Sequence, residues 1–400
     1  MREQLSVEEY IDELLKLVAP DGRCEDVPVA GALGRVLAED VVSAASIPVF
    51  DNSAMDGYAV TWSDLIAVPA RLRVVGDVPA GSDADPAAGP GECVRIMTGA
   101  ALPTFADTVV PVELTELAGD EVVVLQAPAG KGAHVRMAGE DVGPGTVVAS
   151  AGTTITPGVA GAIAAVGVEH VAVRPRPRVS VCVTGDELVR GGSLRRGQIY
   201  ESNSIAVGSL LEHLGAGLVR TDLVRDRPQQ LVDWLDTMAP DTDLAVLTGG
   251  ASVGAYDVVR DVVTAAGGTF RHVRMQPGKP QGWGVWKGTP VVCLPGNPVS
   301  AVVSAEIFIR PMLDLVLGRP ALRWQTAVAG SDWTSPNGRR QVVPVTLGTD
   351  DEGRLVAVPA HTGGSGSHLV TSLAGADGYA MVREETTAVH AGDLLSVRWR

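Results

Sequence analysis

Apolar positions in the first 20 residues repeat at helical spacing after the polar run "SVEE". They are Tyr10, Ile11, Leu14, Leu15 and Val18. Because a serine followed three residues later by a glutamate forms a capping box, the pattern predicts an amphipathic helix over residues 6–18. From about residue 47 to 150 the pattern changes to short apolar runs such as "RLRVVGDV" and "DEVVVLQ", separated by turn residues. This second part is expected to be β-rich.

The stretch "RPRPR", residues 174–178, precedes another change of pattern. Each proline blocks a helix and restricts the residue before it, so a linker is expected here. Apolar runs such as "RVSVCVTG" and "DLAVLTGG" then alternate with helical stretches such as "SNSIAVGSLLEHLG". This alternation predicts a doubly wound, mostly parallel sheet with helices on both faces. After "LGRP" the β pattern returns, which predicts a small β-domain at the end of the chain.

Composition and charge narrow the function classes. The 400 residues are 46% hydrophobic and include 47 glycines and 26 prolines, which is typical of a globular protein with several domains. A net charge of −15, without a run of Lys or Arg, argues against nucleic-acid binding. The sequence contains no stretch of about 18 apolar residues and no signal-peptide pattern, so no membrane span and a cytoplasmic location are expected.

Cysteines and histidines do not predict a zinc site. Cys182 and Cys293 lie inside apolar runs, and no cysteine pair has CxxC spacing, which favours reduced thiols, with these two buried. The 7 histidines are scattered, so catalytic zinc is not expected. The absence of a GxSxG elbow and of a GxxxxGK[ST] loop argues against an α/β-hydrolase and a P-loop NTPase.

Three predicted strands end in glycine-rich polar turns. The turns are Thr184-Gly185-Asp186-Glu187, Thr248-Gly249-Gly250-Ala251-Ser252-Val253-Gly254 and Leu294-Pro295-Gly296-Asn297-Pro298. Ligands of open parallel sheets bind beyond the carboxyl ends of the strands. Glycine lets the backbone approach a ligand and the following helix adds its dipole, so the three loops together are expected to hold phosphate. Any one of them alone also fits an ordinary βα turn.

Carboxylates gather at the same predicted edge. They are Asp186, Glu187, Asp226 and Asp257. Hard oxygen ligands suit Mg²⁺, which bridges phosphate to protein, although each acid also fits a helix cap or first turn. Lys279, after a Pro-Gly turn, is expected to meet an anionic oxygen or to be a solvated loop residue. Asn297 and Pro298 also fit the cap and first position of a helix.

Nine motifs occur in one order along the chain: "DNSAMDGYAV", "RIMTGA", "AGEDV", "TGDEL", "SNS", "TGGASVGAYD", "PGKP", "LPGNPVS" and "GSGSHL". Together they resemble the molybdopterin molybdenumtransferases, the molybdenum insertases of the MoeA type related to the gephyrin E domain. The resemblance spans nearly the whole chain. It implies an enzyme that takes molybdate and adenylylated molybdopterin and, in a Mg²⁺-dependent step, releases AMP and leaves molybdenum on the dithiolene.

The resemblance also implies an α/β plus β-rich fold in an elongated four-domain subunit. The implied domains are an N-terminal linking and dimerisation domain (1–46 and 140–173), an inserted β-rich domain (47–139), a molybdopterin-binding α/β domain like the molybdopterin adenylyltransferases (174–322), and a C-terminal β-barrel (323–400). The implied partners are a second copy of the chain, small-molecule substrates and, transiently, a molybdopterin adenylyltransferase.

Residue roles follow from the same resemblance. The implied catalytic residues are Asp56, Glu187, Asp226 and Asp257, of which the last three are also the implied metal ligands. The implied substrate-binding residues are Thr98, Thr184, Gly185, Gly249, Gly250, Ser252, Gly254, Lys279, Pro295, Gly296, Asn297, Pro298 and Ser367. Because Asp56 lies in a different domain from the sheet, it is expected to complete the site across a dimer interface.

This sequence departs from the family pattern at two positions. Gln276 and Met137 stand where many relatives have a basic residue, so anion binding is expected to rest more on Arg136 and backbone N–H groups. Two other functions fit parts of the chain. The α/β part alone fits a molybdopterin adenylyltransferase, and a non-catalytic binding scaffold or inactive paralogue is a third interpretation. No residue type separates molybdate from tungstate.

Overall fold

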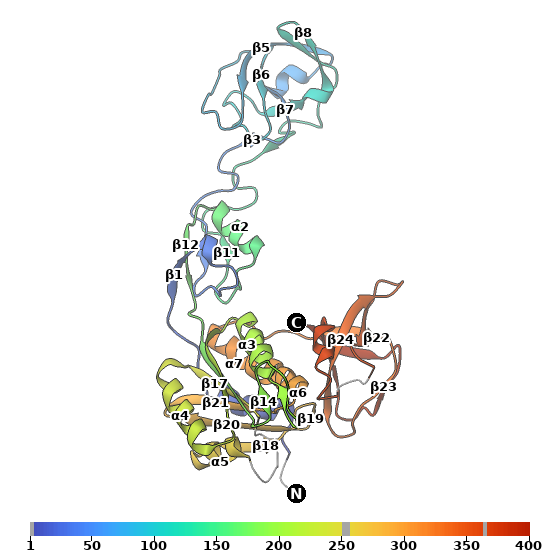
Figure 1. The fold of residues 1–400 in the computed structure, drawn as a ribbon. Coiled ribbons are helices and arrows are strands. Elements are labelled where there is room, and N and C mark those ends of the chain that lie inside the picture. The colour runs from blue at the N-terminus through green and yellow to red at the C-terminus, as the bar shows by residue number, and fades with distance from the viewer. Residues whose placement is uncertain (1–3, 250–256, 363–365) are drawn as a thin grey trace. The chain divides into compact units, whose positions relative to one another are not determined.

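The computed structural model describes residues 4–249, 257–362 and 366–400, which fall into two compact units (Figure 1). Unit 1 comprises Met1–Glu25, Gly34–Ala38 and Val173–Arg400, and unit 2 comprises Asp26–Leu33 and Glu39–Ala172. The four domain boundaries expected from the sequence stay a prediction. Within the described ranges, no helix is long and apolar enough to cross a membrane.

Unit 1 is built on a six-stranded sheet. Its strands, in spatial order, are β16 (Gly217–Val224), β13 (Arg178–Thr184), β17 (Leu244–Thr248), β21 (Thr289–Leu294), β20 (Pro280–Trp286) and β18 (Thr269–His272). The first four are parallel, whereas β20 runs antiparallel to both β21 and β18. The predicted mostly parallel sheet is confirmed. The sequence pattern missed β20, which contains two glycines and follows a Pro-Gly turn.

Helices cover both faces of this sheet. One face carries α1 (Val7–Leu15), α3 (Asn203–His213), α6 (Pro298–Ser304) and α7 (Arg310–Leu317), and the other carries α4 (Pro228–Met238) and α5 (Val258–Ala265). Successive residues of one strand enter opposite cores, because side chains alternate along a strand. Val181 and Val246 pack in the first core, and Cys182 and Leu247 in the second. The sheet is therefore doubly wound, and Cys182 is buried as predicted.

Helix α1 begins with the predicted capping box. The Ser6 hydroxyl accepts from the Glu9 N–H at 3.1 Å, and the Glu9 carboxylate accepts from the Ser6 N–H. The buried Tyr10 hydroxyl donates to the backbone oxygen of Gly282 at 3.1 Å. The helix thus packs in the core of unit 1, although the sequence places residues 1–46 in an N-terminal domain.

The helical segment after the "LPGN" loop is not one continuous α-helix. A π-helical segment, η5 (Ala305–Ile309), separates α6 from α7. Pro311, in the first turn of α7, has no N–H to donate to the backbone oxygen of Ile307, so the ordinary helical pairing is lost there.

The last part of unit 1 is a closed barrel. Its strands, in spatial order, are β24 (Arg340–Thr349), β25 (Leu355–Pro359), β22 (Gln325–Ala329), β28 (Leu394–Trp399) and β26 (Gly378–Val382). A further pairing of β26 with β24 closes the ring, which confirms the predicted C-terminal β-barrel. Strand β19 (Met275–Gln276) adds to β24 from outside the ring. Smaller elements are β14 (Leu188–Val189), β15 (Ile199–Tyr200), β23 (Trp333–Thr334), β27 (Ala388–Val389) and α8 (Thr371–Ala374).

Unit 2 is β-rich, as predicted. Its main sheet, in spatial order, is β7 (Thr108–Pro111), β4 (Gly57–Val60), β6 (Glu92–Ile96), β5 (Ala70–Val78), β9 (Glu121–Val124) and β8 (Thr115–Ala118). Short two-stranded pairs are β3 (Asn52–Ser53) with β10 (Val135–Arg136), β2 (Val41–Val42) with β11 (Val147–Ala149), and β1 (Glu25–Pro28) with β12 (His170–Val173). Helix α2 (Pro157–Ala165) is capped by Thr156, whose hydroxyl accepts from the Val159 N–H at 3.3 Å.

Candidate active site

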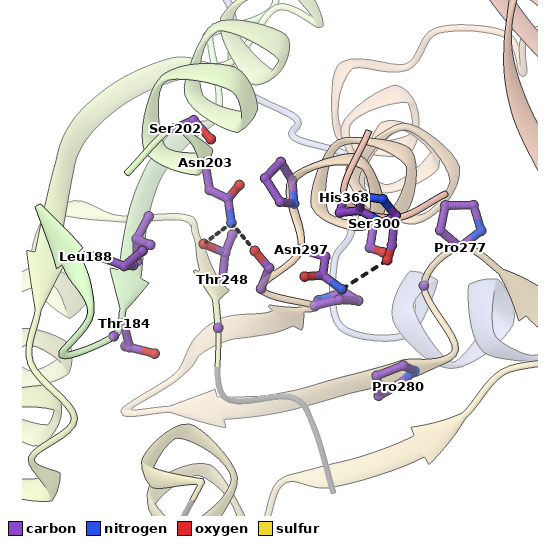
Figure 2. A pocket seen from close by; sticks show the side chains of 18 of the residues that line it. Thr184, Leu188, Ser202, Asn203, Thr248, Pro277, Pro280, Asn297, Ser300 and His368 are labelled. Atoms are coloured by element: carbon purple, nitrogen blue, oxygen red, sulfur yellow. Dashed lines mark hydrogen bonds between the residues drawn. The ribbon is translucent and has the colours of Figure 1, made fainter. Parts of the chain in front are cut away.

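A cavity of about 780 Å³ lies in unit 1 at the carboxyl ends of β13, β17 and β21. Twelve of the seventeen site residues expected from the sequence line it: Thr184, Gly185, Glu187, Asp226, Gly249, Asp257, Lys279, Pro295, Gly296, Asn297, Pro298 and Ser367. Figure 2 shows several of its side chains pointing toward one another from different elements. Gly250, Ser252 and Gly254 lie outside the described residues. The three strand-end loops thus meet at one edge of the sheet.

Glycines let these loops pack backbone against backbone. Gly249 has φ +97°, and a Cβ there would lie 2.6 Å from the Thr184 backbone oxygen. A Cβ on Gly296 would lie 3.3 Å from the Cα of Gly249. The loop after β17 is therefore held between the other two, and a side chain at Gly249 would separate them.

Asn203 joins two of the lining segments and was missed by the sequence analysis. Its buried side-chain nitrogen donates to the Gly296 backbone oxygen at 2.7 Å and lies 3.5 Å from the Thr248 hydroxyl (Figure 2). Its side-chain oxygen is buried and finds no partner among the described residues. The residue belongs to the "SNS" motif, but an Asn at a helix start also fits a simple cap, so local sequence gave no separate signal.

Glu201, also missed from the sequence, holds the start of α3. Its buried carboxylate accepts from the Ser204 N–H at 2.7 Å and from the Ser204 hydroxyl at 2.5 Å. The Arg190 Nε lies 3.7 Å from the same carboxylate. This network fixes the helix end that carries Asn203.

The three expected metal ligands line the cavity from separate loops. Asp257 caps α5, since its Oδ1 accepts from the Arg260 N–H at 3.0 Å, while its buried Oδ2 has no partner in the described part of the chain. Asp226 Oδ2 accepts from the Asp186 N–H at 3.2 Å. Burial raises the pKa of Asp257 and of Asp226, and the charges of Asp186 and Glu187 raise the pKa of Asp226 further.

Residues 4–249, 257–362 and 366–400 contain no group of three or more His, Cys, Asp or Glu side chains placed to hold a metal ion. Glu187, Asp226 and Asp257 share the cavity without forming such a group. The metal-ligand assignment therefore stays a prediction.

The barrel contributes a polar wall to the cavity. Arg339, Ser367 and His368 line it together with Lys279. The Asn297 side-chain nitrogen donates to the Ser367 hydroxyl at 3.0 Å, so it contacts the barrel and makes no cap hydrogen bond to α6 (Figure 2). Pro298 occupies the predicted first helical position. Sequence reasoning missed Arg339, because only the folded barrel brings it to the sheet.

Two expected residues lie in unit 2. Asp56 Oδ1 accepts from both the backbone N–H and the hydroxyl of Thr98, each at 2.7 Å. These two bonds lower the pKa of Asp56. The structure thus pairs the two residues that the sequence assigned to the site from this part of the chain.

Family models match almost the whole chain. They are the MoeA N-terminal region (domain I and II) over residues 5–167, a probable molybdopterin binding domain over 180–315, and the MoeA C-terminal region (domain IV) over 326–398. A molybdopterin molybdenumtransferase 2 of Mycobacterium tuberculosis is 42% identical across 93% of this chain and 94% of its own length. The chain belongs to the MoeA family of molybdopterin molybdenumtransferases.

Other comparisons agree with the MoeA assignment. A molybdopterin molybdenumtransferase of Haemophilus influenzae is 30% identical over 98% of both chains. The solved structure of a molybdopterin biosynthesis MoeA protein from Pyrococcus horikoshii OT3 has a TM-score of 0.84 at 27% identity and covers 100% of both chains. The cavity of this MoeA chain is lined by segments of the matched molybdopterin binding domain and of the matched C-terminal region.

Proposed function

We propose that the protein inserts molybdenum from molybdate into adenylylated molybdopterin and releases AMP. The observation that carries this proposal is the meeting of three glycine-rich loops, four carboxylates and two cationic side chains in one cavity of a MoeA family member. Glycine-rich loops that start helices suit the phosphates of such a substrate. The full-length match to MoeA favours an insertase over a separate adenylyltransferase.

Positive charge in the cavity suits oxyanions. Lys279 follows Gly278, and Arg339 enters from the barrel, so both cations reach one cavity from different segments. A guanidinium binds tetrahedral oxyanions through paired N–H groups, and an ammonium acts as a point charge. We assign these two residues, with Ser367, to molybdate and to the phosphate oxygens nearest to it. Their charges offset the repulsion that the cavity carboxylates exert on an anion.

Mg²⁺ is the metal that we propose, held by Glu187, Asp226 and Asp257. The buried Oδ2 of Asp257, which has no partner in ranges 4–249, 257–362 and 366–400, and the raised pKa of Asp226 indicate carboxylates that a cation would stabilise. Mg²⁺ is usually held by one or two carboxylates together with substrate phosphates, so a complete protein cage is not needed. When bound, the ion neutralises charge that develops as the phosphoanhydride bond breaks.

The chain's own residues position the substrate. The Asn203–Gly296 hydrogen bond holds the loop that receives a phosphate, and the Asn297–Ser367 bond holds the barrel wall beside it. The wall covers part of the cavity, and the water that it displaces leaves each charge interaction beside it stronger. AMP forms when a water molecule attacks its phosphorus in line, so that one P–O bond forms as the bond to the bridging oxygen breaks. The electron pair of the broken bond stays on the molybdopterin phosphate, and the proton of the water is released.

Asp56 is proposed to complete the site from a partner subunit of a homodimer. Thr98 engages only Oδ1 of this exposed carboxylate, so Oδ2 stays available to a ligand.

We further propose a cytoplasmic location and a transient contact with the molybdopterin adenylyltransferase that supplies the substrate. Tight binding of adenylylated molybdopterin without turnover would instead favour the scaffold interpretation.

The direct test follows AMP release from adenylylated molybdopterin with molybdate and Mg²⁺. The wild-type chain should release AMP, whereas Glu187→Ala and Asp257→Ala should release it at least 100-fold more slowly. Asp261→Asn, a change at an exposed acid of the same helix as the Asp257 cap, is the matched control. Release no faster than in the two alanine variants would refute the proposal. Adding tungstate as a competitor measures the oxyanion preference.

A further inference from the structure

A second cavity, of about 230 Å³, lies in unit 1 away from the candidate active site. We call it the arginine pocket, and its lining is His213, Arg310, Leu322, Arg323, Gln325, Arg398, Trp399 and Arg400. These residues come from the end of α3, the start of α7, the segment that leads into the barrel, the first residue of β22, and the barrel strand β28 with its end. No Asp or Glu side chain belongs to this lining.

The charge of the arginine pocket is only partly compensated. The buried Glu306 carboxylate accepts through Oε1 from Arg310 Nε at 2.7 Å and from Arg398 Nη2 at 2.8 Å. Arg323 and Arg400 form no ion pair with any carboxylate in the described part of the chain. The charges of Arg310 and Arg398 also act on Asp314, which is ion-paired with Arg319 outside the lining. Four guanidinium groups therefore face two neighbouring carboxylates, in a chain whose net charge is −15. Such a local excess of positive charge attracts anions.

Arg398 is a buried cation whose hydrogen-bonding groups are only partly satisfied. It is 7% exposed, its guanidinium lies 4.7 Å from the centre of the Trp324 ring, and its Nε has no partner in the described residues. Burial lowers the pKa of Arg398, the Glu306 charge raises it, and the neighbouring Arg310 lowers it again. A buried cation with an unused donor is costly unless a further acceptor reaches it.

We propose that the arginine pocket binds a tetrahedral oxyanion of the phosphate class. Guanidinium groups present paired N–H donors that match the oxygens of such an anion. The cavity volume suits a small anion or a single phosphate group of a larger molecule. Inorganic phosphate, the phosphate of a nucleotide and molybdate share this chemistry.

An anion in the arginine pocket would also tie the barrel to the α/β part of unit 1. Arg323 and Arg400 belong to the connecting segment and the end of the barrel, whereas His213 and Arg310 belong to helices of the α/β part. The same barrel carries Arg339 and Ser367 to the active-site cavity. Binding of an anion in the arginine pocket would therefore stabilise the position of the barrel wall that carries Arg339 and Ser367.

Calorimetric titration of the full chain with inorganic phosphate, at constant ionic strength in a phosphate-free buffer, tests the proposal. The variant Arg323→Gln/Arg400→Gln should bind phosphate at least tenfold more weakly than wild type. Both side chains are exposed, so the double variant is expected to fold. Arg383→Gln, a change at an exposed barrel arginine outside the pocket, is the matched control and should bind as wild type does.

Titrations with AMP and with molybdate identify the source of the oxyanion, since the preferred one should lose most affinity in the double variant. Hydrogen exchange should show that phosphate protects residues 319–325 and 394–400. Absence of phosphate binding, equal affinity in wild type and double variant, or protection confined to the loops around Lys279 would each overturn the proposal.

Discussion

The side-chain nitrogen of Asn203 donates a 2.7 Å hydrogen bond to the backbone oxygen of Gly296, so the first turn of α3 is fixed to the loop after β21. The two residues are 93 positions apart in the chain. Because Asn203 is buried, water does not replace its amide freely when the side chain is shortened.

Asn203→Ala should therefore loosen the site. Leaving a buried acceptor without its donor costs about 1–3 kcal/mol of unfolding free energy. We expect a loss in this range in urea unfolding of the full chain, together with weaker binding of adenylylated molybdopterin. Asn337→Ala, at an exposed turn, is the control and should leave both unchanged. Unaltered stability in Asn203→Ala would show that the hydrogen bond does not hold the loop.

Gly249→Ala tests the close approach of two loops. The change places a Cβ 2.6 Å from the Thr184 backbone oxygen at a φ of +97°, whereas Gly288→Ala meets nothing within 4 Å at a φ of +91°. Both changes carry the backbone strain of about 1–2 kcal/mol, but only the first also forces the loops apart. Thermal unfolding should show a larger destabilisation for Gly249→Ala and loss of AMP release in that variant alone. Equal effects would mean that backbone strain accounts for both.

Asp257→Asn should separate stability from activity. The buried Oδ2 of Asp257 has no partner among the residues that the structure describes, and burial raises the pKa of this carboxyl, so the charged side chain is a source of instability in the folded chain. The asparagine keeps the cap oxygen for the Arg260 N–H and removes the charge. We expect a melting temperature at or above that of wild type, with AMP release at least 100-fold slower. A clear fall in melting temperature would contradict this account, and Asp261→Asn again serves as control.

Thr98→Val should change the titration of Asp56. The Thr98 N–H and hydroxyl lower the pKa of this carboxyl from its usual 3.8, and the variant removes the hydroxyl while it keeps the N–H. The pKa of Asp56 should rise toward its usual value without reaching it. In carboxyl NMR of the full chain, Thr104→Val, which removes a similar bond to Asp85, should leave the Asp56 titration unchanged. An unshifted Asp56 in Thr98→Val would contradict the assigned cause.

The sign of the accompanying stability change follows from this direction of shift. A carboxyl whose folded-state pKa is lowered stabilises the fold above its unfolded pKa, and that contribution is lost as pH falls through the folded pKa. Thr98→Val should therefore reduce stability at neutral pH, and its difference from wild type should shrink on acidification below the usual Asp range. A difference that grew on acidification would have the wrong sign.

Patterns among neighbouring residues were sufficient to predict much of the fold. The Ser6–Glu9 capping box and the Thr156 cap depend on residues three positions apart, so the sequence displays them directly. The strand-end glycine loops were found in the same way, because their meeting follows from parallel strand order.

Features that depend on contacts between residues far apart in the chain were not predicted from the sequence. Strand β20 lacks an apolar pattern because the Phe270 ring packs against Gly282. A Cβ at this position would lie only 2.5 Å from the ring, so the strand has a glycine where an apolar side chain would otherwise stand. Asn203 and Arg339 enter the site through partners far along the chain. Whether Glu187, Asp226 and Asp257 hold one cation depends on geometry that the motif does not encode.

Strand β19 joins the barrel to the loop that carries Lys279. Met275 pairs with Arg340 and Gln276 with Gln341, immediately before the turn that carries Lys279 and immediately after Arg339. Both cavity cations are thus aligned by a single strand pairing, whose two halves come from the α/β part and from the barrel. An α/β domain excised without the barrel would lose the template that sets the position of Lys279 as well as Arg339 itself. Replacing the terminal domain would therefore change the positions of both cations in the candidate active site, even if every loop of the sheet kept its sequence.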